Sequence, residues 1–167
     1  MDTKIARLKE EIYLVSLDVK DKYYQKALTK IQDLITTFPE RAEPYYELGR
    51  FCYDNWLSED AEANYQKALK IDPEYFPTYR EYCFLLIKSG RYDDAINIIE
   101  KAFTLKTKEI SDIYFYLGLA YQHKDEIEEA IDNYKLSLRH SANEKQISSA
   151  RAFLETCLDL KEKYLYR

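Results

Sequence analysis

Small residues recur along the chain at a regular interval, between stretches that are rich in charged and large apolar side chains. An alanine returns after 34, 34 and 35 residues, at Ala27, Ala61, Ala95 and Ala130. Seven residues after each alanine comes a second short residue, at Leu34, Ala68, Ala102 and Ser137. Two antiparallel helices pack closely only where a small residue lies at their crossing, so this register predicts a series of helix pairs that stack on one another. The predicted repeat segment is 1–143, with pairs at about 8–41, 42–75, 76–110 and 111–143, and the first pair is degenerate in its first helix.

One more helix is predicted after the last pair, in the segment 144–167. Its apolar residues fall on one face, at Ile147, Ala150, Leu154, Cys157 and Leu158. A terminal helix with one apolar and one polar face closes the open end of a helical stack. We therefore interpret 144–167 as a cap, and the alternative is a helix that dimerises or swaps.

The phrases around the alanines resemble the tetratricopeptide repeat, a 34-residue helix–turn–helix with the pattern W-x2-L-G-x2-Y…A-x3-F…P. The best copy consists of Tyr45, Leu48, Gly49, Cys52, Ala61, Tyr65, Ala68 and Pro73. A second copy consists of Tyr114, Leu117, Gly118, Tyr121, Ala130, Tyr134 and Ser137. The resemblance implies an all-α fold, a right-handed superhelical α-solenoid of antiparallel helix pairs. The 3 glycines and 4 prolines agree with this, because an all-β fold needs many more turn residues.

The resemblance also implies a binding surface, since in this family the first helix of each pair lines a concave groove. The groove residues expected on that pattern are Tyr13, Tyr46, Arg50, Tyr53, Arg80, Phe84, Lys88, Phe115, Tyr116, Leu119 and His123. Tyrosine and arginine are enriched at binding hot spots. The alternative is that these side chains cover their neighbours inside a tight superhelix.

We therefore expect an adaptor or scaffold that binds an extended or helical segment of another protein in this groove. The alternatives are a dedicated small chaperone of a secretion-type substrate and a self-assembling structural protein. A homo-oligomer is left open.

Catalytic motifs are missing from the sequence. It has 2 histidines, neither in a zinc motif, and its 3 glycines cannot form a phosphate-binding loop. Cys52, Cys83 and Cys157 are scattered and odd in number, which suggests neither a disulfide framework nor a metal site. We therefore expect no enzyme activity, no cofactor and no metal.

The net charge of −5 argues against nucleic acid or an anionic membrane as the main partner, because both need a basic face. The N-terminus lacks the apolar core of a signal peptide, and the longest uncharged stretch, 113–123, is too short to span a membrane. These features predict a cytoplasmic protein.

The turn around Trp56 is a separate feature, because Trp56 falls where the next helix pair has Gly90. Asn55 is expected to adopt the left-handed conformation that glycine usually supplies. Trp56 is then expected to fold back onto the adjacent helix, and the alternative is an exposed contact point. Ser58 and Asp125 are expected to cap the helices that follow their turns.

Overall fold

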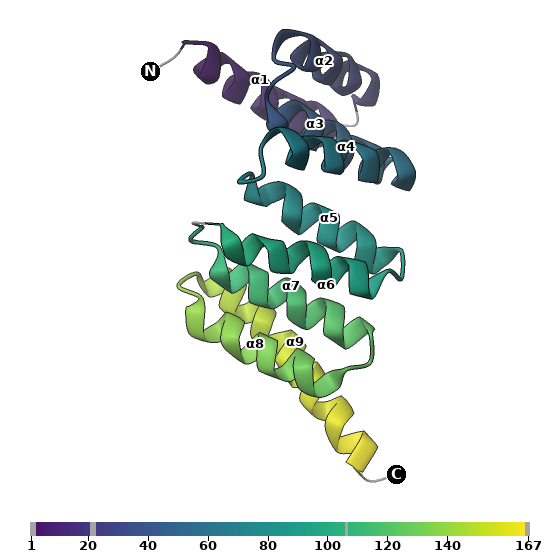
Figure 1. Ribbon diagram of the computed structural model, residues 1–167, viewed down its shortest axis with the longest axis vertical. Helices are drawn as coiled ribbons and strands as arrows, with labels where there is room; N and C mark the ends of the chain where they lie inside the picture. Colours follow the sequence, from purple (N-terminus) through teal and green to yellow (C-terminus); the bar gives the residue numbers. More distant parts are fainter. Residues whose placement is uncertain (1–2, 21–22, 106, 166–167) are drawn as a thin grey trace. The chain divides into compact units, whose positions relative to one another are not determined.

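Helix is the regular secondary structure throughout the part of the chain that the computed structural model describes, namely residues 3–20, 23–105 and 107–165 (Figure 1). The predicted all-α fold class is confirmed. Residues 1–2, 21–22, 106 and 166–167 lie outside the described residues, and they fall within the predicted segments 1–143 and 144–167. The described helices also lack the combination of length and apolarity that a bilayer crossing demands.

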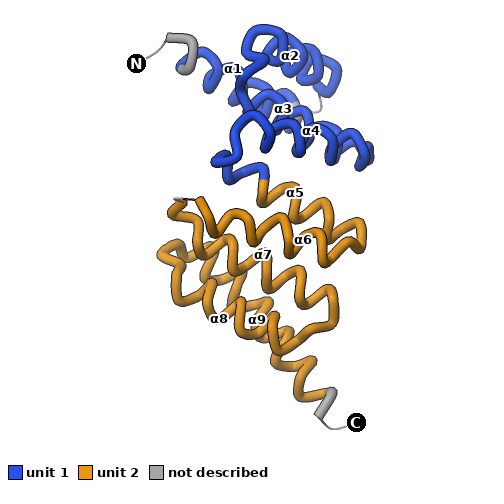
Figure 2. The backbone as a smooth tube through the Cα atoms, viewed as in Figure 1, with its two compact units in different colours: residues 1–78 blue, residues 79–167 orange. Residues whose placement is uncertain are grey.

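The chain divides into two compact units, residues 1–78 and residues 79–167 (Figure 2). Unit 1 holds four helices and the start of a fifth: α1 (Thr3–Lys20), α2 (Tyr24–Thr37), α3 (Ala42–Asp54), α4 (Ser58–Ile71) and the first turn of α5 (Phe76–Lys88). Within unit 1, α1 packs against α2 and α3, α2 packs against α3, and α3 packs against α4.

Unit 2 holds the rest of α5 and the helices that follow it. These are α6 (Tyr92–Lys101), the short 3-10 helix η1 (Ala102–Thr104), α7 (Ile110–His123), α8 (Ile127–His140) and α9 (Glu144–Leu165). Here α6 packs against α7, α7 against α8, and α9 against both α7 and α8. Ala150 and Cys157 are the fully buried anchors of α9, whereas Leu158, which we assigned to its apolar face, is exposed.

The recurring small residues lie at the helix crossings, as their spacing predicts. Ala27, Ala61, Ala95 and Ala130 have no exposed surface at all. The glycines on the facing helices are equally constrained. A Cβ at Gly49 would lie 2.6 Å from the ring of Tyr65, and a Cβ at Gly118 would lie 2.8 Å from the ring of Tyr134. Both rings are buried, so each glycine makes room for an aromatic side chain that fills the interior.

Three turns between paired helices share one hydrogen-bond pattern, in which a left-handed residue ends the first helix. The left-handed residues are Trp56 (φ 64°), Asp125 (φ 66°) and Gly90 (φ 73°). The amide after each of them donates to a carbonyl five residues earlier, as in Leu57 N–H to Cys52 C=O at 2.9 Å. This is the Schellman arrangement, which satisfies the last carbonyls of a helix.

Three expectations about these turns are wrong. Asn55 is not left-handed, because its φ is −102° and the hydrogen-bond pattern places the left-handed residue one position later. Trp56 does not fold back, since its side chain is 92% exposed. Ser58 and Asp125 are not caps either: Leu57 and Glu126 occupy the cap positions of α4 and α8, and neither makes a side-chain cap hydrogen bond.

Candidate functional site

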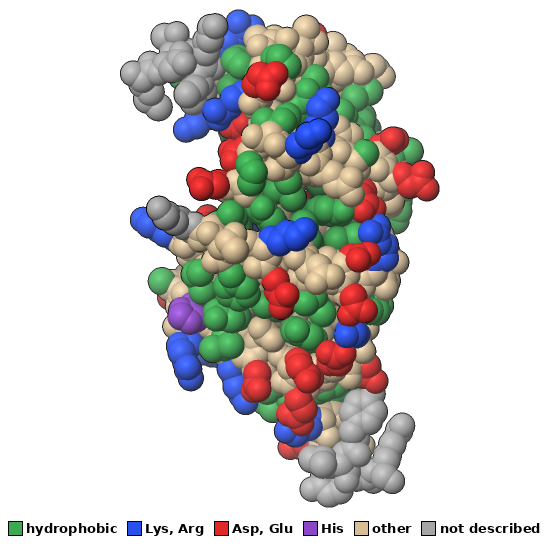
Figure 3. Space-filling view, viewed as in Figure 1, with side chains coloured by type: hydrophobic (Ala, Val, Ile, Leu, Met, Phe, Trp, Pro, Cys, Tyr) green, Lys and Arg blue, Asp and Glu red, His purple; other side chains and the backbone are tan. Residues whose placement is uncertain are grey.

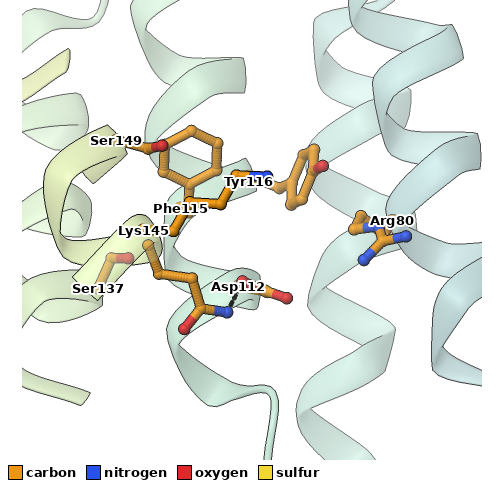
Figure 4. A pocket seen from close by; sticks show the side chains of 8 residues that line it. Arg80, Asp112, Phe115, Tyr116, Ser137, Lys145 and Ser149 are labelled. Carbon is orange, nitrogen blue, oxygen red and sulfur yellow. Dashed lines mark hydrogen bonds between the residues drawn. The ribbon is translucent and has the colours of Figure 1, made fainter. Parts of the chain in front are cut away.

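A hollow of about 320 Å³ opens in unit 2 where α5, α7 and α9 come together (Figure 4). Its lining combines aromatic rings with polar and charged side chains from four helices: Arg80, Asp112, Phe115, Tyr116, Ser137, Lys145, Gln146 and Ser149. Three of these, Arg80, Phe115 and Tyr116, belong to the groove residues predicted from the sequence.

The floor of the hollow consists of the rings of Phe115 and Tyr116, and further aromatic rings pack against Phe115. The ring of Phe115 meets the ring of Tyr116 edge-on, with centroids 5.5 Å apart, and meets Phe153 of α9 in the same way at 5.4 Å. Phe115 also contacts the buried ring of Tyr134, 5.8 Å away. These contacts fix the orientation of Phe115, so the floor is formed before anything binds.

Asp112 joins the start of α7 to the start of α9. The side-chain amide of Gln146 donates a hydrogen bond of 2.6 Å to Asp112 Oδ1, drawn as a dashed line in Figure 4. Burial raises the pKa of the Asp112 carboxyl above its ordinary value, although nearby Arg80 and the bond from Gln146 act in the opposite direction. Asp112 therefore accepts a hydrogen bond from Gln146, while burial disfavours its ionised form.

Arg80 forms the α5 side of the hollow. Its guanidinium pairs with Glu81, with an N–O distance of 3.1 Å, and the Arg80 side chain is still about one third exposed. Burial raises the pKa of the Tyr116 hydroxyl. The positive charge of Arg80 acts in the opposite direction, but its effect on this pKa is smaller than that of burial. Tyr116 thus stays a neutral phenol at physiological pH and offers one donor beside a positive charge.

Lys145, Gln146 and Ser149 form the α9 side, and our sequence reasoning missed all three. The reason is that α9 was interpreted as a cap, which needs only an apolar inner face. The signal was present, because these polar residues lie within two turns at the start of that helix. Lys145 and Ser149 are both exposed.

The other groove residues predicted in unit 2 have different surroundings. Leu119 is buried, and Phe84 is half-buried with the Lys88 ammonium 5.3 Å from its ring. His123 is exposed and stacks on Tyr92, with centroids 6.0 Å apart.

In unit 1 the predicted groove residues belong to two kinds. Tyr46 is buried and packs edge-on against Tyr75 at 5.4 Å, and the Arg50 guanidinium lies 5.7 Å from the Tyr46 ring. Arg50 also pairs with the buried carboxylate of Glu47 at 3.3 Å. Tyr13, by contrast, is 63% exposed on α1, and Tyr53 of α3 is half-buried.

The described residues offer little support for a metal site or a reactive cysteine. The described residues contain no group of three or more His, Cys, Asp or Glu side chains placed to hold a metal ion. Cys52, Cys83 and Cys157 are free thiols and are buried. Burial raises the pKa of each of the three thiols, so they stay protonated and weakly nucleophilic.

The charged side chains of unit 2 are mixed in sign. Over the described part of the face drawn in Figure 3, acidic, basic and hydrophobic side chains are interspersed, without a continuous basic patch. This distribution differs from the basic stripe that nucleic-acid backbones require.

Several solved structures are similar in fold to this chain. In structure, it resembles pilF of Pseudomonas aeruginosa with a TM-score of 0.81, at 21% identity, over 95% of this chain and 70% of that one. Yeast Tom70 matches with a TM-score of 0.79 and 18% identity, over 93% of this chain and 34% of Tom70. At these identities the likeness concerns the fold.

In sequence, the chain is 27% identical over 154 residues to RxLR effector protein SFI4 of Phytophthora infestans (strain T30-4). That match covers 88% of this chain and 41% of the effector, so the chain spans about two fifths of this relative's length. Two models of the tetratricopeptide repeat match residues 58–109 and 85–144. Together with the crossing residues described above, these matches show that the chain belongs to the tetratricopeptide repeat family.

Proposed function

We propose that the chain is a protein–protein interaction adaptor, and that the unit 2 hollow receives an extended or helical segment of a partner protein. The observation that carries the proposal is the pre-formed aromatic floor of Phe115 and Tyr116 beneath a rim of polar side chains. Binding sites are typically apolar concavities with a few well-placed polar groups. Membership of a repeat family whose units stack to form binding surfaces supports the same function.

The rim indicates the chemistry of the partner segment. Arg80 and Lys145 supply positive charge, and Gln146, Ser149 and the Tyr116 hydroxyl supply further donors. The one acidic side chain of the lining, Asp112, already accepts the bond from Gln146. A segment that carries an apolar side chain for the floor and a carboxylate for the rim therefore fits the hollow best.

Unit 1 offers a second, separate candidate surface. Tyr13 is exposed there and Tyr53 is half-buried, and Tyr46 and Arg50 contact Tyr75 and Glu47 respectively. A cytoplasmic location and the absence of a nucleic-acid or membrane partner remain predictions from the sequence, as do the chaperone and self-assembly alternatives.

A peptide display library tests the proposal. The purified chain is panned, and enriched peptides are measured by fluorescence anisotropy against Ser149→Phe, which adds a ring to the rim, and against Ser148→Phe. Ser148 is an exposed neighbour on α9 that lines a different depression, so it is the matched control. We expect acidic-apolar peptides whose affinity falls at least about tenfold in Ser149→Phe and stays unchanged in Ser148→Phe. Equal affinity for both variants would remove the hollow as the binding site.

A further inference from the structure

Trp56 adopts a backbone conformation that suits it poorly. Its φ is 64°, and the two turns with the same hydrogen-bond pattern carry Gly90 and Asp125 at this position. Glycine has no Cβ to clash there, and aspartate tolerates the left-handed region better than most residues. A bulky aromatic residue at this position costs stability, so the folding of the turn gives no reason for a tryptophan.

The same turn exposes an unusual amount of apolar surface. The indole of Trp56 is 92% exposed, and the side chain of the next residue, Leu57, is 49% exposed. Tryptophan is one of the three residue types enriched at binding hot spots, which cluster near the centre of protein interfaces. The Trp56–Leu57 turn is therefore a projecting apolar knob with the composition of an interface centre.

The charges around this knob select the kind of surface that it fits. Asp54, Glu59 and Asp60 are all exposed and lie within four residues of Trp56. Such a ring of carboxylates disfavours an anionic lipid surface and favours an apolar recess with a basic rim.

This chain carries a recess of that description. The unit 2 hollow has an aromatic floor of Phe115 and Tyr116, and Arg80 and Lys145 stand at its rim (Figure 4). Its volume of about 320 Å³ is in the range of small binding pockets and is large enough for one indole.

We propose that the Trp56–Leu57 turn of one copy docks into the unit 2 hollow of a second copy. The indole rests on Phe115 and Tyr116, and the carboxylates of Asp54, Glu59 and Asp60 face Arg80 and Lys145. The inference depends on the proposed function only because both use the same hollow. Since knob and hollow are different surfaces, the contact is heterologous, and each bound copy keeps one of the two surfaces available for a further copy.

The knob supplies its own probe, because Trp56 is the single tryptophan of the chain. Intrinsic fluorescence is recorded from micromolar to millimolar concentration, alongside sedimentation velocity. We expect the emission to shift to shorter wavelength and the mean mass to rise together, and both changes to weaken as salt is added. A chain that stays monomeric with hydrated-indole emission at millimolar concentration overturns the inference.

Two variants each remove one side of the contact. Trp56→Gly removes the knob and relieves the left-handed strain, so a loss of association cannot be attributed to unfolding. Ser149→Phe obstructs the hollow. We expect each variant to weaken self-association at least about tenfold, which corresponds to about 1.4 kcal/mol. The matched controls are Tyr23→Ala, which removes another exposed aromatic ring of unit 1, and Ser148→Phe.

Mixing the two defective variants gives the decisive result. Trp56→Gly retains the hollow and Ser149→Phe retains the knob, so an equimolar mixture should form a one-to-one dimer that neither variant forms alone. A mixture that stays monomeric, or a Ser149→Phe chain that associates like wild type, overturns the docking in the hollow. Either failure leaves the proposed function intact if display peptides still bind the hollow, and it is the peptide experiment alone that decides that function.

Discussion

The helix pairs α3–α4 of unit 1 and α7–α8 of unit 2 have the same interior. Each crossing residue in one pair has a counterpart 69 positions later in the other: Gly49 and Gly118, Ala61 and Ala130, Tyr65 and Tyr134. In both pairs the glycine admits the tyrosine ring, and in both the first helix ends on a left-handed residue. The repeat thus determines how two helices cross.

The groove-facing positions of α3 and α7, compared at the same spacing of 69 residues, carry different side chains. Where α3 has the buried carboxylate of Glu47 and its partner Arg50, α7 has Tyr116 and Leu119. The unit 1 face is therefore closed by an internal ion pair and an aromatic contact, whereas the unit 2 face opens into an aromatic hollow. The crossing positions must satisfy the close packing of two helices, whereas the face positions do not. Residues at the face positions can therefore change with function at little cost in stability.

The largest effect is expected where the two pairs are most alike. Gly49→Val and Gly118→Val each place a Cβ within 2.8 Å of a buried tyrosine ring, and the branched side chain adds more bulk. Each should lower the free energy of unfolding by about 3 kcal/mol or more. Urea unfolding followed by circular dichroism measures this.

Gly90→Ala is the control, because its Cβ would meet nothing within 4 Å and only the positive φ opposes it. It should cost about 1 kcal/mol. If both valine variants were no worse than Gly90→Ala, the glycine–tyrosine crossing would not be the constraint that we infer.

The second effect concerns a polar contact that unit 2 has and unit 1 lacks. Ser111 and Ser137 are buried, and each hydroxyl donates to the other residue's carbonyl, at 3.0 and 2.9 Å. The counterparts in unit 1 are Ala42 and Ala68. Ser137→Ala should therefore cost about 1–2 kcal/mol, because it removes the bond that the Ser137 hydroxyl donates and leaves the buried Ser111 C=O without it.

The double variant Ser111→Ala with Ser137→Ala reproduces the apolar contact of unit 1. It should cost less than the sum of the two single variants, and the coupling energy from a double-mutant cycle checks this. Strict additivity would show that the two hydroxyls do not act as a pair.

The two arginines are expected to separate binding from stability. Arg50→Glu sets a second carboxylate beside buried Glu47 and removes the cation from the Tyr46 ring, so it should destabilise unit 1 by about 1–2 kcal/mol, allowing for the partial exposure of Arg50. Arg80→Glu should change the free energy of unfolding less, yet weaken binding of acidic peptides to the hollow at least about tenfold. The reverse pattern, measured by thermal melts and anisotropy, would place the binding surface in unit 1.

The crossing residues could be predicted from the sequence because the close approach of two helices constrains each of them in the same way. The constraint recurs every 34 or 35 positions. Ala95 and Tyr134 are buried for that reason. The face positions carry no such repeat, so the sequence could not distinguish Arg50, which pairs with the buried carboxylate of Glu47, from Arg80 at the rim of the hollow. Lys145 and Ser149 escaped prediction because a cap requires nothing of its polar side.

The conformation of Trp56 shows a different limit. Steric preference alone favoured Asn55 as the left-handed residue, but the chain's hydrogen bonds place that conformation at the residue before the Leu57 amide. The alignment with Gly90 contained the answer, since the register of the turn is stronger than the preference of one residue.

The smallest effect is expected at Asp112, whose counterpart in unit 1 is Glu43. Burial raises the pKa of the Asp112 carboxyl from its ordinary value of 3.8, so the folded state holds this proton more tightly than the unfolded state. Ionised Asp112 therefore lowers stability above its folded pKa, and this cost disappears as the pH falls through the folded pKa toward 3.8. Asp112→Asn keeps an oxygen for the bond from Gln146 and removes the charge, so it should unfold at a slightly higher urea concentration than wild type at neutral pH, with the advantage vanishing near pH 4. A less stable Asp112→Asn at neutral pH would mean that attraction to Arg80 outweighs burial.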